Sequence, residues 1–205
     1  MKKSFALVAA TGIVLAALAA GIYSYTTAGQ LASNTTVAQP PLPAKPQPAS
    51  IPAGPVTLIG TYFSIEYSDT EEPHAKSGYS LDLYKQGNIV FGDIAVANGS
   101  LEPSQASIYD AVYNEEQKTI SFKAKYSDGS EFVGDKERES RVLLTFSGKI
   151  GKDQIEGTVT KLDGYTHEPL DKQELAVIPK TEGAPDLPAS FEEWNKSNFH
   201  PVPKW

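Results

Sequence analysis

Strict alternation of apolar and polar residues is the feature that most constrains how this chain folds. Across residues 57–180 apolar side chains recur at every second position, as at Ile120, Phe122, Ala124 and Tyr126. A period of two places successive side chains on opposite faces of a β-strand, so that one face is buried and the other is solvated. No stretch of this region has the 3.6-residue apolar period of an amphipathic helix. The pattern therefore predicts an all-β domain over residues 57–180.

Turn signals divide this domain into eight expected strands. Pairs such as Asn98-Gly99 and Asp163-Gly164 are typical of tight connections. Short connections make neighbouring strands antiparallel, and the simplest arrangement is an up-and-down meander. Eight such strands close into a barrel, which leaves no exposed edge; a two-sheet β-sandwich is the alternative. The expected strands span residues 58–67, 78–86, 88–97, 106–114, 118–127, 139–149, 153–162 and 172–178.

Residues 1–27 are typical of a targeting segment. Lys2 and Lys3 precede an uncharged apolar run over residues 5–23. Nineteen residues of helix span about 28 Å, close to the ~30 Å hydrocarbon core of a bilayer. Two interpretations stay open: an uncleaved hydrophobic helix that anchors the chain in the inner membrane, or a signal peptide whose cleavage leaves a secreted or periplasmic protein. Both keep the lysines in the cytoplasm and place the rest on the extracytoplasmic side.

Proline-rich stretches lie on either side of the expected β-domain. Seven of the 15 prolines fall between Pro40 and Pro55. Because proline fixes φ and has no backbone N–H, residues 28–56 are predicted to form an extended, disordered linker. The tail, residues 181–205, holds four further prolines and both tryptophans of the chain.

The tail also contains a predicted helical turn and a cluster of aromatic residues. Ser190, followed by two glutamates, is a suitable N-cap for one turn through Trp194. Disordered segments are poor in aromatic residues, so we expect this tail to dock on the barrel. Trp194 is expected to be the better buried tryptophan because Phe191 and Phe199 share its contact. The alternative is a short linear motif for a partner.

Three segments of the β-domain resemble strands of lipocalin-like and avidin-like (calycin-type) β-barrels: Gly60-Thr61-Tyr62; residues 77–81 followed by 87–92; and residues 146–150 followed by 155–158. The resemblance implies a small barrel whose mouth holds a ligand. Tyr62 stands where those barrels often have a tryptophan. The resemblance assigns no ligand-binding residue to this chain, and Tyr62 is kept as a candidate beside the aspartates considered below. The β-domain itself contains no tryptophan, which argues against a biotin-type pocket lined by that residue.

Carboxylates on the expected strands supply the other candidate site residues. Asp93 and Asp110 both lie among apolar neighbours. If these carboxylates face inward, each must have a partner for its charge or burial will raise its pKa. If the register of the strands is shifted by one residue, both carboxylates face outward. Two such carboxylates in one cleft would serve a hydrolase as acid and base. The full set of strand carboxylates is Glu66, Asp82, Asp93, Asp110 and Glu156.

Composition excludes several other classes of function. The chain has no cysteine, which excludes disulfides and thiolate metal sites, and its net charge of −7 argues against nucleic-acid binding. His74, His167 and His200 lack metal-ligand spacing, so no metal site and no cofactor are expected. No nucleophile elbow or phosphate-binding loop is present, and we assign no catalytic residue.

Together these features predict an exported, membrane-tethered binding or interaction module of the cell envelope. Its partner is expected to be a small apolar ligand or an envelope protein. An envelope hydrolase and a structural accessory protein are the alternatives. A cavity inside the barrel favours the binding module, two carboxylates in one cleft favour the hydrolase, and an interior filled by its own side chains favours the accessory protein.

Overall fold

The computed structural model describes residues 54–183 and 185–205, which belong to one compact unit. The predicted anchor over residues 5–23 and nearly all of the predicted linker lie outside these residues. Within the described ranges no helix has both the length and the apolar character needed to cross a membrane.

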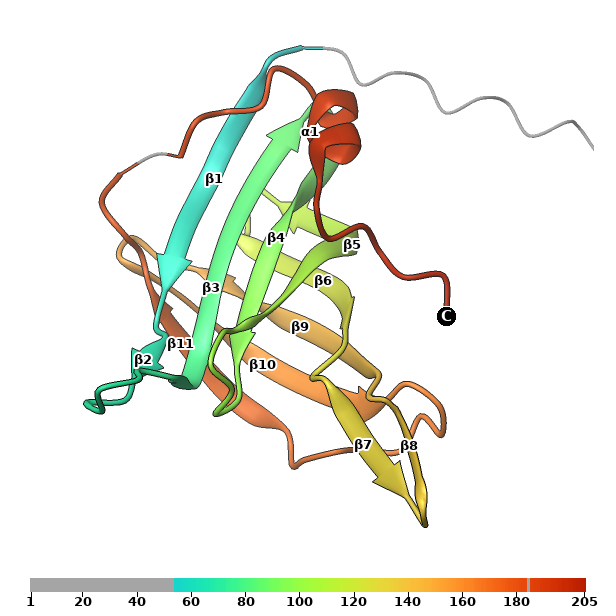
Figure 1. The fold of residues 1–205 in the computed structure, drawn as a ribbon. Coiled ribbons are helices and arrows are strands. Elements are labelled where there is room, and N and C mark those ends of the chain that lie inside the picture. The colour runs from blue at the N-terminus through green and yellow to red at the C-terminus, as the bar shows by residue number, and fades with distance from the viewer. Residues whose placement is uncertain (1–53, 184) are drawn as a thin grey trace, which may run out of the picture. The chain divides into compact units, whose positions relative to one another are not determined.

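The described chain consists of antiparallel β-strands and one short helix (Figure 1). All eight strands expected from the alternation are present, with ends displaced by a few residues. A two-residue strand, β2, and a small separate hairpin, β7–β8, are additional. The elements are β1 Val56–Phe63, β2 Glu66–Tyr67, β3 Ala75–Gln86, β4 Ile89–Ala97, β5 Ser104–Asn114, β6 Thr119–Tyr126, β7 Ser130–Val133, β8 Lys136–Glu139, β9 Val142–Ile150, β10 Gln154–Asp163, β11 Glu174–Pro179 and α1 Phe191–Ser197.

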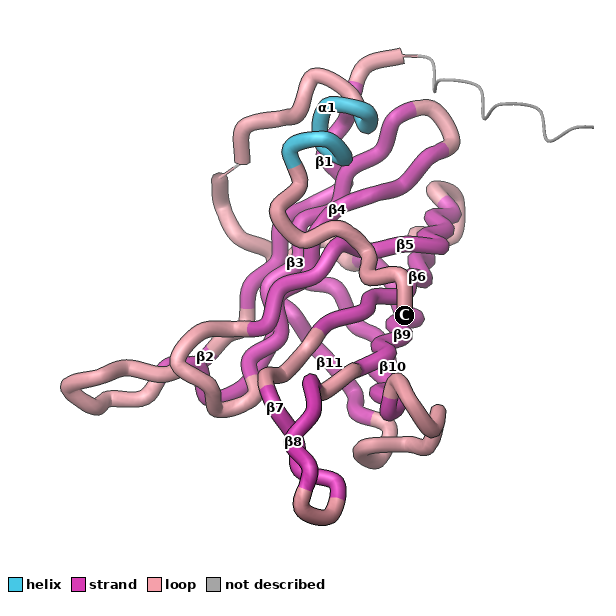
Figure 2. The backbone as a smooth tube through the Cα atoms, turned by 45° about the vertical axis from the view of Figure 1, so that its right-hand side comes forward, coloured by secondary structure: helices cyan, strands magenta, loops and turns pink. Residues whose placement is uncertain are grey.

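The eight long strands form one meandering sheet in which sequence neighbours pair, in the order β1-β3-β4-β5-β6-β9-β10-β11. The predicted up-and-down antiparallel topology is therefore confirmed. The sheet curls strongly into a half-barrel (Figures 1 and 2). Its first and last strands meet where Tyr62 is bridged to Lys180 and where the Thr181 N–H donates to the Thr61 carbonyl at 2.9 Å.

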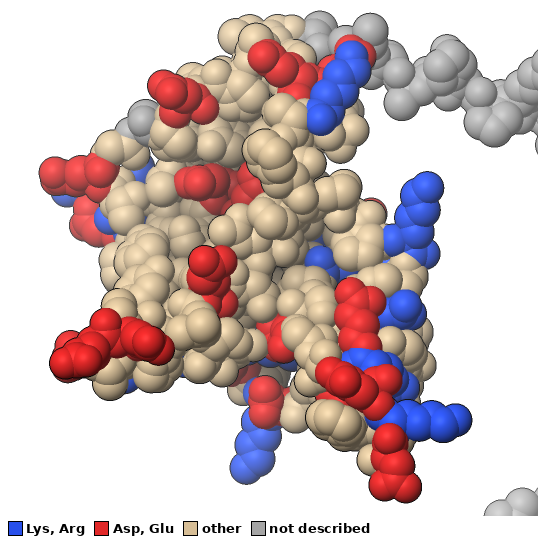
Figure 3. Space-filling view, in the orientation of Figure 1, with Lys and Arg blue, Asp and Glu red and all other residues tan. Residues whose placement is uncertain are grey.

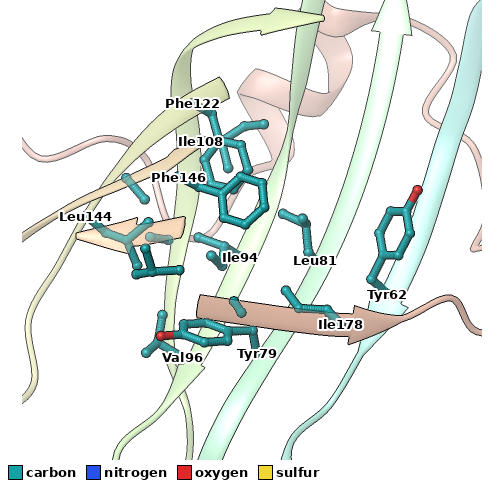
Figure 4. Packing of buried hydrophobic residues seen from close by; sticks show 14 of the residues in the cluster. Tyr62, Tyr79, Leu81, Ile94, Val96, Ile108, Phe122, Leu144, Phe146 and Ile178 are labelled. Atoms are coloured by element: carbon teal, nitrogen blue, oxygen red, sulfur yellow. The ribbon is translucent and has the colours of Figure 1, made fainter. Parts of the chain in front are cut away.

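Large side chains fill the concave side of this sheet (Figure 4). The rings of Phe122 and Phe146 stack with their centroids 5.0 Å apart. Gly148 and Gly157 face each other across β9 and β10, and a Cβ at Gly148 would lie 2.7 Å from the Phe146 ring. These two glycines thus make room for Phe146 in the core. The largest fully buried side chains of this core are Tyr62, Phe122, Phe146, Leu81, Leu83, Ile94, Ile120, Leu144, Ile155, Ile178 and Val96.

The ladder between β4 and β5 covers only part of their length. It runs from Val96–Ser104 to Asp93–Ser107 and ends there. Beyond Ser107 strand β5 pairs only with β6, and a bulge between Tyr109 and Val112 bends it. Residues 89–92 of β4 pair only with β3. We call the resulting gap between residues 89–92 of β4 and 108–111 of β5 the split.

Candidate functional site

Helix α1 lies on the outer face of the sheet, beside β3 and β4 (Figure 1). The sequence predicts this helix correctly: the Ser190 hydroxyl accepts a hydrogen bond from the Glu193 N–H at 3.1 Å, and Glu192 and Glu193 occupy the positively polarised first turn. Seven residues are too few for a stable isolated helix. The helix therefore depends on its contact with the sheet.

A small apolar cluster holds α1 in place. Phe91, on the outer side of β4, is 1% exposed because the rings of Trp194 and Phe191 cover it at centroid distances of 5.1 and 5.2 Å. The expected docking of the tail is thus confirmed for Trp194. The expectation that Phe199 shares this contact is wrong, since Phe199 is 92% exposed. The chain is extended after α1, so Asn198 and His200 turn toward Ser107 while Phe199 between them points to solvent.

The side chain of Gln86 joins two parts of the chain at the end of β3. Its Nε2 donates to the Gly54 carbonyl at 2.9 Å, and its Oε1 accepts from the Phe191 N–H at 2.8 Å. The amide nitrogen and the amide oxygen of this buried side chain therefore both have a hydrogen-bond partner. The contact fixes the start of β1 and the start of α1 to the same strand.

Asp93 faces outward and lies beneath the tail. Its Oδ2 accepts a hydrogen bond of 3.1 Å from the Trp194 indole. Its Oδ1 lies 3.4 Å from the Ser107 hydroxyl, which shares its single proton between this oxygen and the nearer His200 carbonyl at 2.6 Å. Burial raises the pKa of Asp93; the two hydrogen bonds oppose this shift, and the negative charge of Asp82 adds to it. Asp82 stands directly opposite Asp93 in the ladder between β3 and β4. The structure thus brings two of the five predicted strand carboxylates together.

Asp110 also faces outward, so neither aspartate has the inward orientation. It lies in the β5 bulge with a φ of 50°, a left-handed conformation that aspartate tolerates better than most residues. Its Oδ2 accepts a hydrogen bond from the Lys123 ammonium at 3.0 Å, in an exposed ion pair. A strict period of two would place Asp110 on the same inward face as Ile108. The bulge shifts the register after Tyr109 and turns Asp110 outward.

Tyr62 lies in the core and apart from both aspartates. It is fully buried on β1, and its hydroxyl has no hydrogen-bond partner among the described residues (Figure 4). Burial raises its pKa, and Tyr113 adds to the shift. The structure therefore does not bring Tyr62, Asp93 and Asp110 into one site.

A groove of about 390 Å³ lies between the split and the tail, which we call the tail groove. Residues from both faces of the sheet line it: Val90 and Ile108 pack toward the core, whereas Ile89 and Phe91 belong to the outer side. Trp194 and Asn195 of α1 and Pro201 and Val202 of the tail form its outer wall, and Asp110 lies at its rim. The pair of Asp82 and Asp93 lines a separate, smaller hollow of about 200 Å³.

Beyond α1, Ser107 anchors the tail. Its N–H and its hydroxyl donate to the His200 carbonyl at 3.3 and 2.6 Å, and the Asn198 amide contacts the same hydroxyl. In Figure 2 the tail then continues past β5 to the C label. The tail therefore contacts β5 at Ser107, the residue where the ladder to β4 ends.

The end of the tail docks in a stack of alternating cations and aromatic rings, the cation–aromatic ladder. Trp205 lies between Arg141 and Lys125, whose cations are 5.3 and 5.2 Å from its ring centroid. Lys125 also donates to the Pro203 carbonyl at 3.4 Å. Each such contact contributes about 0.5–1 kcal/mol at exposed sites. The ladder comprises Arg138, Tyr165, Arg141, Trp205, Lys125 and Tyr109.

Sequence reasoning did not identify Gln86, Ser107 or the cation–aromatic ladder. Gln86 and Ser107 occupy polar positions of the alternating pattern, where exposure is expected, yet both are buried. No local signal reveals this burial, because the covering segment lies about 90 or more residues away in the sequence.

The described residues carry a strong negative charge. They hold all 25 acidic residues but only 15 of the 18 basic ones, which gives a net charge of −10. In Figure 3 acidic side chains are spread over the visible face, including the part near α1, while basic side chains lie mainly at the right and lower edges. A partner that approaches this face meets a largely acidic surface.

Comparison of the chain with models of known protein families, with curated proteins and with solved structures gave no match. The fold and the groove therefore define the site by themselves: an antiparallel half-barrel with a filled interior and an outer groove bordered by its own tail.

Proposed function

We propose that this chain is an interaction module of the cell envelope, held at the inner membrane by residues 5–23, which binds a partner protein through the tail groove. One observation carries the proposal: the tail groove lies on the outside of the sheet and offers a binding surface there. The concave interior is packed with large side chains, which is the result expected of a structural accessory protein and argues against a ligand cavity inside the barrel. A pocket of 300–1,000 Å³ lined by apolar groups and a few polar ones is typical of a binding site.

The resemblance to calycin-type barrels stays a prediction in this proposal. In that interpretation the half-barrel closes at the contact between Tyr62 and Lys180. A small apolar ligand at the barrel mouth would then have to displace core side chains such as Tyr62. Binding at the tail groove requires no such change, and this favours a partner on the outer face.

A photo-crosslinking experiment in living cells tests the proposal. A photoreactive amino acid at Asn195, which lines the tail groove, is compared with one at Ser197, which lies on another side of the same helix. We expect a discrete adduct with an envelope protein, identified by mass spectrometry, from position 195 and not from position 197. Adducts of equal yield from both positions, or from neither, would contradict the proposal.

A hydrolase is the second candidate, and the juxtaposition of Asp82 and Asp93 supports it. Two neighbouring carboxylates, one with a raised pKa, are typical of acid–base catalysis. Reaction with a water-soluble carbodiimide and an amine separates the two candidates. An accessible catalytic Asp93 is modified in the folded protein, whereas an Asp93 that only holds the tail is shielded by Trp194.

A further inference from the structure

The split leaves two backbone edges without ladder partners. In an antiparallel strand, alternate residues turn their N–H and C=O groups to opposite sides. Residues 89–92 of β4 use one side for β3, and residues 108–111 of β5 use one side for β6. Among the described residues, neither segment has a ladder partner on the side that faces the split. Such groups form hydrogen bonds most readily with another extended backbone.

The tail groove follows these two edges. Its walls include Asn88 of the turn before β4, residues 89–91 of β4 and residues 107–111 of β5. Side chains from both faces of the sheet contribute, Val90 and Ile108 on the core side and Phe91 and Trp194 on the outer side. A space bounded in this way lies within the layer of the sheet. An inserted strand has alternate side chains on the two faces, and each set would meet an apolar wall.

One backbone contact already lies at one end of this space. The His200 carbonyl of the extended tail accepts hydrogen bonds from the Ser107 N–H and from the Ser107 hydroxyl. The last ladder pair of β4 and β5, Asp93 with Ser107, lies at the same residue. A strand in the split would therefore begin beside a residue whose backbone N–H already bonds to an extended segment.

Charge indicates which extended segments suit this site. Asp110 lies at the rim of the groove but is paired with Lys123, and Asp93 is covered by the tail, so the overall charge and not these two side chains decides the preference. The described part of the chain has a net charge of −10. Complementary charge steers association and favours a partner with lysine or arginine beside its binding segment.

We infer that the tail groove takes an extended peptide segment of a partner protein, inserted as a strand between β4 and β5 and bearing apolar side chains at alternate positions with flanking basic residues. The inference rests on the proposed function and names its partner class. Strand addition of this kind takes affinity from main-chain hydrogen bonds and specificity from pockets for alternate side chains.

Synthetic peptides test the inference on the full chain in detergent micelles. The probe is a capped, fluorescein-labelled octapeptide of sequence lysine-valine-threonine-valine-threonine-valine-threonine-lysine. Two matched peptides carry N-methyl groups on the odd or on the even residues, which blocks the main-chain donors toward one edge and leaves the side chains unchanged. Because an inserted strand pairs on both edges, we expect each N-methylated peptide to bind about tenfold more weakly in fluorescence anisotropy.

Two variants and one exchange measurement locate the binding. Asn195→Trp, which fills the groove from α1, should abolish probe binding, whereas Ser197→Trp on the same helix should preserve it. Hydrogen exchange should slow on probe binding at amides of residues 89–91 and 108–111. These readouts do not require a natural partner.

Four outcomes would overturn strand insertion. The first is no binding of the unmodified peptide, and the second is equal binding of all three peptides. The third is strong exchange protection of the split without peptide, which would mean that a second copy or another segment of this chain occupies it. Weakening by only one N-methylated peptide would indicate binding to a single edge and would also reject insertion. If crosslinking at position 195 succeeds while the peptides fail, the interaction function stands and only the partner class is wrong.

Discussion

The indole of Trp194 donates a hydrogen bond of 3.1 Å to the carboxylate of Asp93, 101 residues earlier in the chain. The Ser107 hydroxyl is a weaker, second contact to this carboxylate, because it shares its single proton with the nearer His200 carbonyl. The aspartate is thus partly removed from water, and the indole is its main hydrogen-bond donor. This arrangement ties the docking of the tail to the protonation state of a single group.

Replacement of Asp93 by asparagine should change how stability depends on pH. Because the folded-state pKa of Asp93 is raised, the folded protein binds this proton more tightly than the unfolded chain. The resulting contribution to stability is fully present when the pH is below 3.8, the ordinary pKa of aspartate. It is lost as the pH rises through the raised pKa of Asp93 in the folded protein. The free energy of unfolding of Asp93→Asn, minus that of the wild type, should therefore increase from acidic to neutral pH.

Urea denaturation at a series of pH values measures this difference. Asp135→Asn, in the exposed turn between β7 and β8, is a matched control that should give no such trend. A difference for Asp93→Asn that stays flat or falls with pH would contradict the prediction.

Replacement of the Trp194 side chain by alanine should destabilise the fold, whereas the same replacement of Phe199 should not. Trp194 packs on Phe91 and Phe191, and we expect Trp194→Ala to lower the free energy of unfolding by about 2 kcal/mol. Phe199 is almost fully exposed in the same tail, so Phe199→Ala should change it by less than about 0.5 kcal/mol. Urea denaturation of the two variants gives both values, and equal losses would show that the docking of α1 is misplaced.

The cation–aromatic ladder should shield Trp205 from solvent. In a Trp194→Phe background, Trp205 is the only tryptophan, and its fluorescence reports on the ladder alone. Arg141→Gln removes the cation that lies 5.3 Å from this ring and should shift the emission to the red and increase quenching by iodide or acrylamide. Lys149→Gln, which removes a charge outside the ladder, is the control. Unchanged emission in Arg141→Gln would argue against the stack.

Export is predicted from Lys2, Lys3 and the apolar run over residues 5–23. A reporter enzyme that is active only outside the cytoplasm, fused at Lys204, should be active. The full-length protein should remain with the membrane on fractionation. Recovery of a shorter soluble species would show that residues 1–27 are a cleaved signal peptide and would reject the anchor.

The sequence predicts the strands well because a period of two is itself the geometry of a half-buried sheet. It predicts the orientation of individual residues less well where that period is interrupted. Two positions of the β5 bulge break the alternation, and this places Asp110 outside. Phe91 belongs by pattern to an apolar strand, yet α1 rather than the core buries it. A pattern of apolar residues indicates that a side chain is buried but not which distant segment covers it.

The tail fastens the two parts of the sheet on either side of the split. Helix α1 packs on β3 and β4, whereas Trp205 docks beside Lys125 of β6 and Arg141, which directly precedes β9. During translation the sheet emerges from the ribosome before this strap does. The hairpins can therefore pair before the strap is present, and the strap closes last. If the chain is exported as its sequence predicts, the tail also crosses the membrane last, which leaves an interval in which the split lies open to a partner before the strap is in place.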